Sequence, residues 1–91
     1  MTFNDLDDGV RSEIEQLGWD AGCSWIEDFR EERGRDPEPE ECDEEALATA
    51  EKLADRQAKA ILKRHGIELA DTLLRDVQLA LSRQFVEALE V

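Results

Sequence analysis

Apolar residues recur at intervals of three and four along most of this 91-residue chain. The first such row runs from Phe3 to Phe29, and its spacing places these residues on one face of a helix over about residues 4–33. The row crosses Gly18 in register, which favours one continuous helix. A break at Gly18 would instead give four helices. Gly18 and Gly22 lie one turn apart, and with Ala21 they form a smooth surface for the close approach of another helix.

The same periodicity predicts two further helices, over about residues 44–65 and 68–89. The first has an alanine-rich apolar face, and Gly66 is placed to cap its carboxyl end. The second has the widest and most regular apolar face of the chain. Between residues 34 and 43, Pro37 and Pro39 stand among carboxylates and predict an acidic connector. Asp43 is the expected N-cap of the helix that follows.

These elements predict a single all-α domain over residues 1–91, arranged as an antiparallel three-helix bundle. Leu and Ala dominate the apolar residues and Tyr is absent, which favours helix over sheet. Some apolar residues fall outside the three main faces and predict a homodimer or another apolar interface. These candidate interface residues are Trp19, Cys23, Ile26, Leu79 and Val86.

The net charge of −13 is confined to one half of the chain. Residues 1–45 hold seventeen acids and four arginines, whereas residues 46–91 hold seven acids and seven bases. Acids that only kept a protein soluble would be spread more evenly, although solubility stays an open explanation. The concentration suggests a field directed at a basic protein partner, while direct binding to nucleic acid is not expected because phosphates would be repelled.

Two groups of acids are candidates for binding such a partner. The first is a strip on one face of the first helix: Glu13, Asp20, Glu27 and Glu31. The second lies in and beside the connector: Glu38, Glu40, Glu41, Asp43 and Glu44. Either group could equally be a solvated surface, and part of the second is explained by the preference for acids at a helix start.

The helix over residues 44–65 carries a basic stripe of Lys52, Arg56, Lys59 and Lys63, with Arg64 beside it. A solvated face is the first interpretation of this stripe, docking onto the acidic strip the second and nucleic-acid binding the third. His65 is the single histidine. It is expected to interact with the helix dipole, with nothing nearby to make it a ligand or a base.

No pattern in the sequence indicates catalysis, a metal or a cofactor. Cys23, Cys42 and one histidine lack zinc-ligand spacing, and no glycine-rich loop follows a strand. Cys42 stands among carboxylates and should resist forming a thiolate. The acidic start has no secretory character, and no apolar run is long enough for a membrane span. We therefore expect a cytoplasmic protein that is not an enzyme and has no membrane association.

In size, charge and helical content the chain resembles phage-encoded inhibitors, including nucleic-acid mimics and some anti-CRISPR proteins. That resemblance implies a small protein that binds and inhibits a nucleic-acid-binding protein through a negatively charged helical surface. It carries over no functional residues. The alternative is a helical homodimeric adaptor or structural module whose apolar surfaces bind a partner and whose acids only solvate it. A domain adapted to high salt is disfavoured by the zero net charge of residues 46–91.

Overall fold

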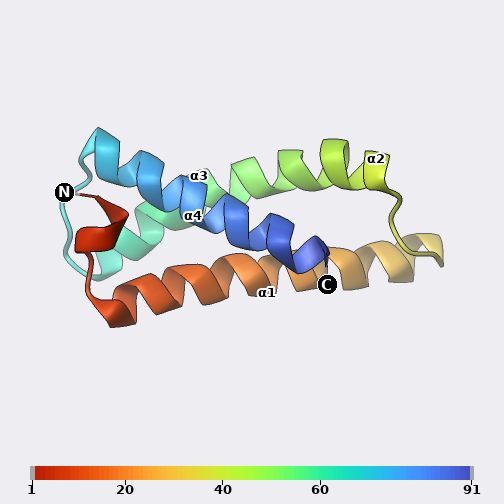
Figure 1. Ribbon diagram of the computed structural model, residues 1–91, viewed down its shortest axis with the longest axis horizontal. Coiled ribbons are helices and arrows are strands. Elements are labelled where there is room, and N and C mark those ends of the chain that lie inside the picture. The colour runs from red at the N-terminus through yellow and green to blue at the C-terminus, as the bar shows by residue number, and fades with distance from the viewer. Residues whose placement is uncertain (1, 91) are drawn as a thin grey trace.

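A computed structural model describes residues 2–90, and every regular element within them is helical (Figure 1). The elements in chain order are the 3-10 turn η1 (Phe3–Asp5), α1 (Asp8–Arg33), α2 (Pro39–Glu41), the π-helical turn η2 (Cys42–Ala46), α3 (Leu47–Arg64) and α4 (Asp71–Leu89). Because α2, η2 and α3 follow one another without a break, the chain forms three rods. The rods pack against one another in a body of 42 × 21 × 18 Å.

Figure 1 shows the path of the chain through these rods. The chain runs from left to right along α1, returns through α2, η2 and α3, and runs from left to right again along α4. The right-hand end of α1 extends past the end of α4, and α2 lies at that same end of the molecule. The fold therefore has two different ends, one made by η1 and the α3–α4 loop and one made by the α1–α2 connection.

A glycine follows each of two helices in the left-handed conformation, as the sequence predicts for Gly66. Gly34 follows α1 with a φ of 66°, and its N–H donates to the carbonyl oxygen of Arg30 at 2.8 Å. Gly66 follows α3 with a φ of 69°. There, Ile67 N–H donates to the Leu62 carbonyl oxygen at 2.8 Å, which completes a Schellman-type end. The left-handed conformation costs glycine little because it has no Cβ.

The first helix begins later than the sequence predicts, at Asp8 instead of residue 4. The residues before it form a separate turn, in which the N–H of Thr2 donates to a carboxylate oxygen of Asp5 at 2.8 Å. Leu6 is extended, and this break folds the turn back onto α4. There the Phe3 N–H donates to a carboxylate oxygen of Asp76 at 3.2 Å. The helical path is interrupted at Leu6, and the Leu6 side chain is buried in the core.

The second rod begins earlier than predicted, at Pro39, so the connector is shorter than residues 34–43. Proline suits the first position of a helix because its missing N–H would have no helical partner there. Asp43 consequently lies inside the π-helical turn and is not an N-cap. The last helix begins at Asp71 instead of residue 68, because Ala70 is extended after the loop.

The core is built from the predicted apolar faces of all three rods. Its largest fully buried side chains belong to Phe85, Ile14, Ile61, Leu62, Leu73, Leu81 and Val77. A row of four alanines on the second rod is also buried, from Ala46 to Ala58 at every fourth position. Small side chains there leave room for the larger side chains of α1 and α4.

The most extensive helix contact is between α1 and α4, and it includes the two glycines of α1 that are four residues apart. Both are buried. A Cβ on Gly18 would lie 2.6 Å from the carbonyl oxygen of Leu81, and one on Gly22 would lie 2.6 Å from that of Phe85. The prediction that these glycines permit close approach of a helix is therefore confirmed, and α1 continues unbroken through Gly18.

We expect Gly18→Ala and Gly22→Ala each to lower the free energy of unfolding by about 1–3 kcal/mol, because the added methyl group forces two backbones apart. Urea denaturation would measure the change. Gly9→Ala is the matched control, since a Cβ there meets nothing within 4 Å. It should raise stability by about 0.4–1 kcal/mol. Equal effects at all three positions would contradict the role of the contact.

Candidate acidic binding surface

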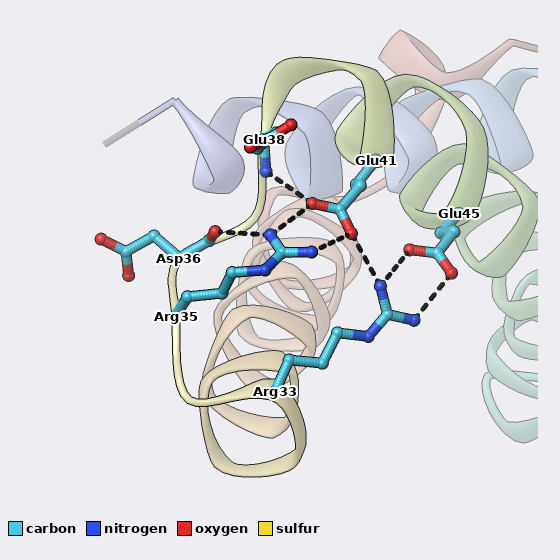
Figure 2. Close-up of polar contacts among 6 residues, drawn as sticks. All are labelled: Arg33, Arg35, Asp36, Glu38, Glu41 and Glu45. Carbon is cyan, nitrogen blue, oxygen red and sulfur yellow. Dashed lines mark hydrogen bonds and ion pairs between the residues drawn. The ribbon is translucent and has the colours of Figure 1, made fainter.

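The connection between α1 and α2 is held by two arginines that share one carboxylate (Figure 2). Arg33 donates to Glu41 at 2.7 Å and to both carboxylate oxygens of Glu45 at 2.8 and 3.0 Å. Arg35 donates through both terminal nitrogens to Glu41, at 2.6 and 2.9 Å. The Glu38 N–H adds a 3.0 Å bond to the same carboxylate. Paired N–H donors on one carboxylate fix both distance and orientation, so this network sets how the chain turns.

The same arginines cover an aromatic side chain near the end of α1. The guanidinium carbon of Arg33 lies 4.4 Å from the centre of the Phe29 ring, and that of Arg35 lies 5.2 Å from it. Trp25 packs against the ring with a centroid distance of 5.4 Å. Phe29 is only 5% exposed as a result. Guanidinium groups bind an aromatic face favourably, so the network closes the core at this end of the bundle.

This network changes the ionisation of its members. The pKa of the Glu41 carboxyl falls to about 2, chiefly because Arg35 donates to it and then because the Glu38 N–H does. Hydrogen bonds to Glu45 and to Glu41 raise the pKa of Arg33 and of Arg35, respectively. Each bond favours the charged form of the group that makes it. Glu41 is therefore a structural carboxylate at neutral pH.

All four arginines of the acidic half of the chain are in ion pairs within the chain. Besides the pair described above, Arg11 binds Asp8 and Arg30 binds Asp36. Residues 27–45, which we call the acidic pole, hold eleven acids and three arginines and so have a net charge of −8. Arg30 binds Asp36, Arg33 binds Glu41 and Glu45, and Arg35 binds Glu41. The other eight acids of the pole are exposed and have no ion pair among residues 2–90.

The structure divides the predicted acidic strip into two parts. Glu13 binds Arg64, and its carboxylate lies 2.6 Å from Nε2 of His65. Asp20 accepts a 2.8 Å hydrogen bond from Gln16. Glu27 and Glu31, by contrast, are exposed and have no ion pair among residues 2–90. The second half of the strip therefore belongs to the acidic pole, whereas Glu13 joins α1 to the end of α3.

The Glu13 contact gives His65 a carboxylate partner on α1, in addition to the predicted position of His65 at a helix end. It also shows which part of the basic stripe docks within the chain. Arg64 binds α1, and Lys59 lies 3.4 Å from Asp55 on its own helix. The remaining basic residues of the stripe, Lys52, Arg56 and Lys63, are exposed.

The connector acids also fall into two groups. Glu41 is bound by two arginines, and Glu38 precedes the first turn of α2. Glu40, Asp43 and Glu44 are exposed, with no ion pair among residues 2–90. These three lie on the same pole as Glu27 and Glu31 because the Arg33 bonds hold α2 and η2 against the end of α1.

The candidate apolar interface residues lie on more than one surface. Trp19, Cys23 and Ile26 are partly buried on one flank of α1, and Trp19 lines a shallow hollow with Gln84 of α4. Leu79 and Val86 line hollows on the α3 side of α4. Leu79 is 61% exposed.

Burial raises the pKa of the Cys42 thiol, and the charges of Asp43 and Glu41 raise it further, as the sequence predicts.

Sequence reasoning missed the three residues that organise this site, Arg33, Arg35 and Glu45. The available signal was the arginine pair around Gly34, which ends a helix just before an acidic helix start. Within residues 2–90, no three His, Cys, Asp or Glu side chains are grouped to hold a metal ion. None of the helices in that range is long and apolar enough to cross a membrane.

No family model, curated protein or solved structure matches this chain.

The low pKa of Glu41 predicts a pH-dependent contribution to stability. Its ordinary pKa is 4.5 and its folded value is about 2, so the stabilisation is present above about pH 4.5 and is lost as the pH falls toward 2. We expect Glu41→Gln to be less stable than wild type at pH 7, with the difference shrinking through that interval. Thermal unfolding followed by circular dichroism at a series of pH values would measure it.

Glu40→Gln is the matched control because Glu40 is adjacent, exposed and outside the arginine network. It should leave the pH profile close to that of wild type. A Glu41→Gln deficit that stays constant from pH 7 to pH 2 would show that the ionised carboxylate does not stabilise the turn.

Proposed function

We propose that this protein is a non-enzymatic inhibitor whose acidic pole occupies the basic, nucleic-acid-binding surface of another protein. One observation carries the proposal. The arginines of the pole are bound to Asp36, Glu41 and Glu45, while the acids around them stay exposed. Five of these exposed acids are Glu27, Glu31, Glu40, Asp43 and Glu44. The arginines stabilise the fold, and the acids left over present an uncompensated negative surface to a partner.

The density of negative charge favours binding through the acidic pole, and disfavours mimicry of nucleic acid along the whole molecule. The part of α1 in the pole, residues 27–33, rises about 10 Å. A nucleic-acid duplex carries about six phosphates along that length. The net charge of the pole is −8, which is of the same size. Along all 42 Å of the molecule a duplex would carry about 25 charges, well above the −13 of this chain.

This function places the protein in the cytoplasm beside a basic partner, in the manner of phage-type inhibitors such as nucleic-acid mimics and anti-CRISPR proteins. Charge complementarity would speed association and make it sensitive to salt. The negative charge of the pole would also repel nucleic acid itself. The partner's own nucleic acid and this protein would then compete for one surface.

A helical homodimeric adaptor is the second candidate function. The observation that favours it is the exposure of Leu79, at 61%, in a hollow that it shares with Leu47, itself 40% exposed. Apolar contacts of this kind would persist in high salt, whereas contacts made by the pole would weaken. Sedimentation of the pure protein would show whether it self-associates.

The salt response of partner capture tests the proposal. The protein is immobilised, and partners are captured from cell extract at 0.05 M and at 0.5 M salt, where the screening length falls to about 4 Å. We expect a nucleic-acid-binding protein to be captured at low salt, released at high salt and displaced by an oligonucleotide. A partner retained equally at both salt concentrations would contradict the proposal.

Two variants of equal net charge locate the effect. The pole variant combines Glu27→Gln, Glu31→Gln and Glu44→Gln, and the control combines Glu15→Gln, Glu68→Gln and Asp71→Asn. All six side chains are exposed and none is in an ion pair among residues 2–90. We expect the pole variant to lose at least tenfold in affinity and the control to lose little. Equal losses would mean that net charge, and not the pole, governs binding.

A further inference from the structure

An apolar hollow of about 350 Å³ opens between the acidic pole and the end of α4. Pro37 and Pro39 contribute to it from the connector, Leu47 from the start of α3, and Val86 and Leu89 from α4. Leu47 is 40% exposed, and the two α4 residues are half-buried. The connection that concentrates the acids therefore also creates an apolar depression among them.

The rim of this hollow is acidic. Asp43 and Glu90 line it together with the apolar residues, and both are exposed without an ion pair among residues 2–90. Glu40 and Glu44 stand on either side of Asp43 in the sequence. An apolar floor with a negative rim attracts a ligand that is itself apolar along one side and positive at its edges.

A second hollow of about 340 Å³ adjoins the first, since both are lined by Leu47. Its lining includes Leu79, so the apolar α4 side chains of the two hollows extend from Leu79 to Leu89. The charged residues Glu51, Asp55 and Arg75 also line the second hollow. We call the two hollows the Leu47 groove. Ten residues of helix rise about 15 Å, which is nearly three helical turns. Such a length fits a docked helix that inserts apolar residues at positions i, i+4 and i+7.

We propose that the Leu47 groove binds an amphipathic helix of the basic partner, with its apolar stripe on Leu47 and Val86 and its Lys or Arg residues beside Asp43 and Glu90. This inference rests on the proposed function and specifies what the pole recognises. Charge selects the occupant. An acidic helix would be repelled by the −8 of the pole, and a second copy would bring another −13.

Three synthetic helical peptides of one length test the proposal. One has leucines at i, i+4 and i+7 with flanking lysines; the second has the same composition with the leucines scattered; the third keeps the leucine stripe but has flanking glutamates. Binding of each labelled peptide is followed by fluorescence anisotropy. We expect the first to bind at least tenfold more tightly than either of the others.

Two leucine variants locate the site. Leu47→Ser should weaken the first peptide at least tenfold, whereas Leu69→Ser should leave it unchanged. Both leucines are exposed to a similar extent, 40% and 37%, and Leu69 lies outside the groove. A readout on the unchanged chain comes from Cys42, which lines the hollow and is a free thiol, as is Cys23. The first peptide should slow alkylation of Cys42 and not of Cys23.

The outcomes separate this inference from the proposed function. If both lysine peptides bind equally and both weaken in the pole variant, the groove inference is overturned while the acidic pole stands. If the leucine stripe binds equally well with lysine or glutamate flanks and the pole variant changes nothing, recognition of a basic partner fails. A dimer that Leu47→Ser dissociates would mean that a second copy covers the groove, which also overturns the inference.

Discussion

The register of the contact between α1 and α4 determines most of this structure. Gly18 lies on the backbone of Leu81 and Gly22 on that of Phe85 and beside Ala88, which is next to the last residue of α4. Eleven residues of α1 therefore follow Gly22, whereas α4 ends one residue after Ala88. The same offset places Leu89, the last residue of α4, level with Ile26, so residues 27–33, about 10 Å of helix, have no α4 beside them. Another segment must cover their apolar side.

The α1–α2 connection provides that cover, and it does so with charge. Phe29 lies on the uncovered part of α1, and the guanidinium groups of Arg33 and Arg35 close over its ring. Those groups are in turn held by Glu41 and Glu45. Isolated surface ion pairs add little stability, but here two arginines share one carboxylate and also bury an aromatic ring. Only Glu41 and Glu45 among the acids of the pole hold Arg33 and Arg35, so most of the acids take no part in this closure.

Helical periodicity was sufficient to predict the all-helical fold, the unbroken path through Gly18 and the close approach at Gly22. These features depend on residue spacing and on small side chains, which can be read locally. The helix starts were harder to predict. Pro39 was interpreted as an interruption, although proline also suits a first helical position, and Leu6 leaves the helix because the core lies behind it. Choosing between such alternatives requires the tertiary packing.

The ion pairs of the acidic site were also hard to predict from the sequence, because they too depend on the tertiary packing. In the sequence, Glu40 and Glu41 are equivalent neighbours, yet only Glu41 faces Arg33 and Arg35. The pairing joins residues eight and six positions apart across a turn whose geometry the sequence leaves open. Likewise, Glu13 and Glu27 share one helix face, but only Glu13 reaches α3. Counting acids therefore overestimates the unpaired negative charge of the strip near Glu13. It also misses the arginines that determine which acids are unpaired.

Two explanations of the acidity, solvation and recognition, differ in what they require of the arginines. Solvation requires only a sufficient net charge, wherever the charged residues lie. Recognition by the pole requires positive groups to be kept off that surface, and Arg30, Arg33 and Arg35 all point their charge to acids of the connection. The apolar hollow beside Asp43 also distinguishes the two explanations. Solvation does not account for it, because exposed leucine does not help to solvate a surface, whereas a binding surface commonly contains exposed apolar residues. Charge and apolar surface at one end of the molecule are the two features that the proposed basic amphipathic partner would recognise.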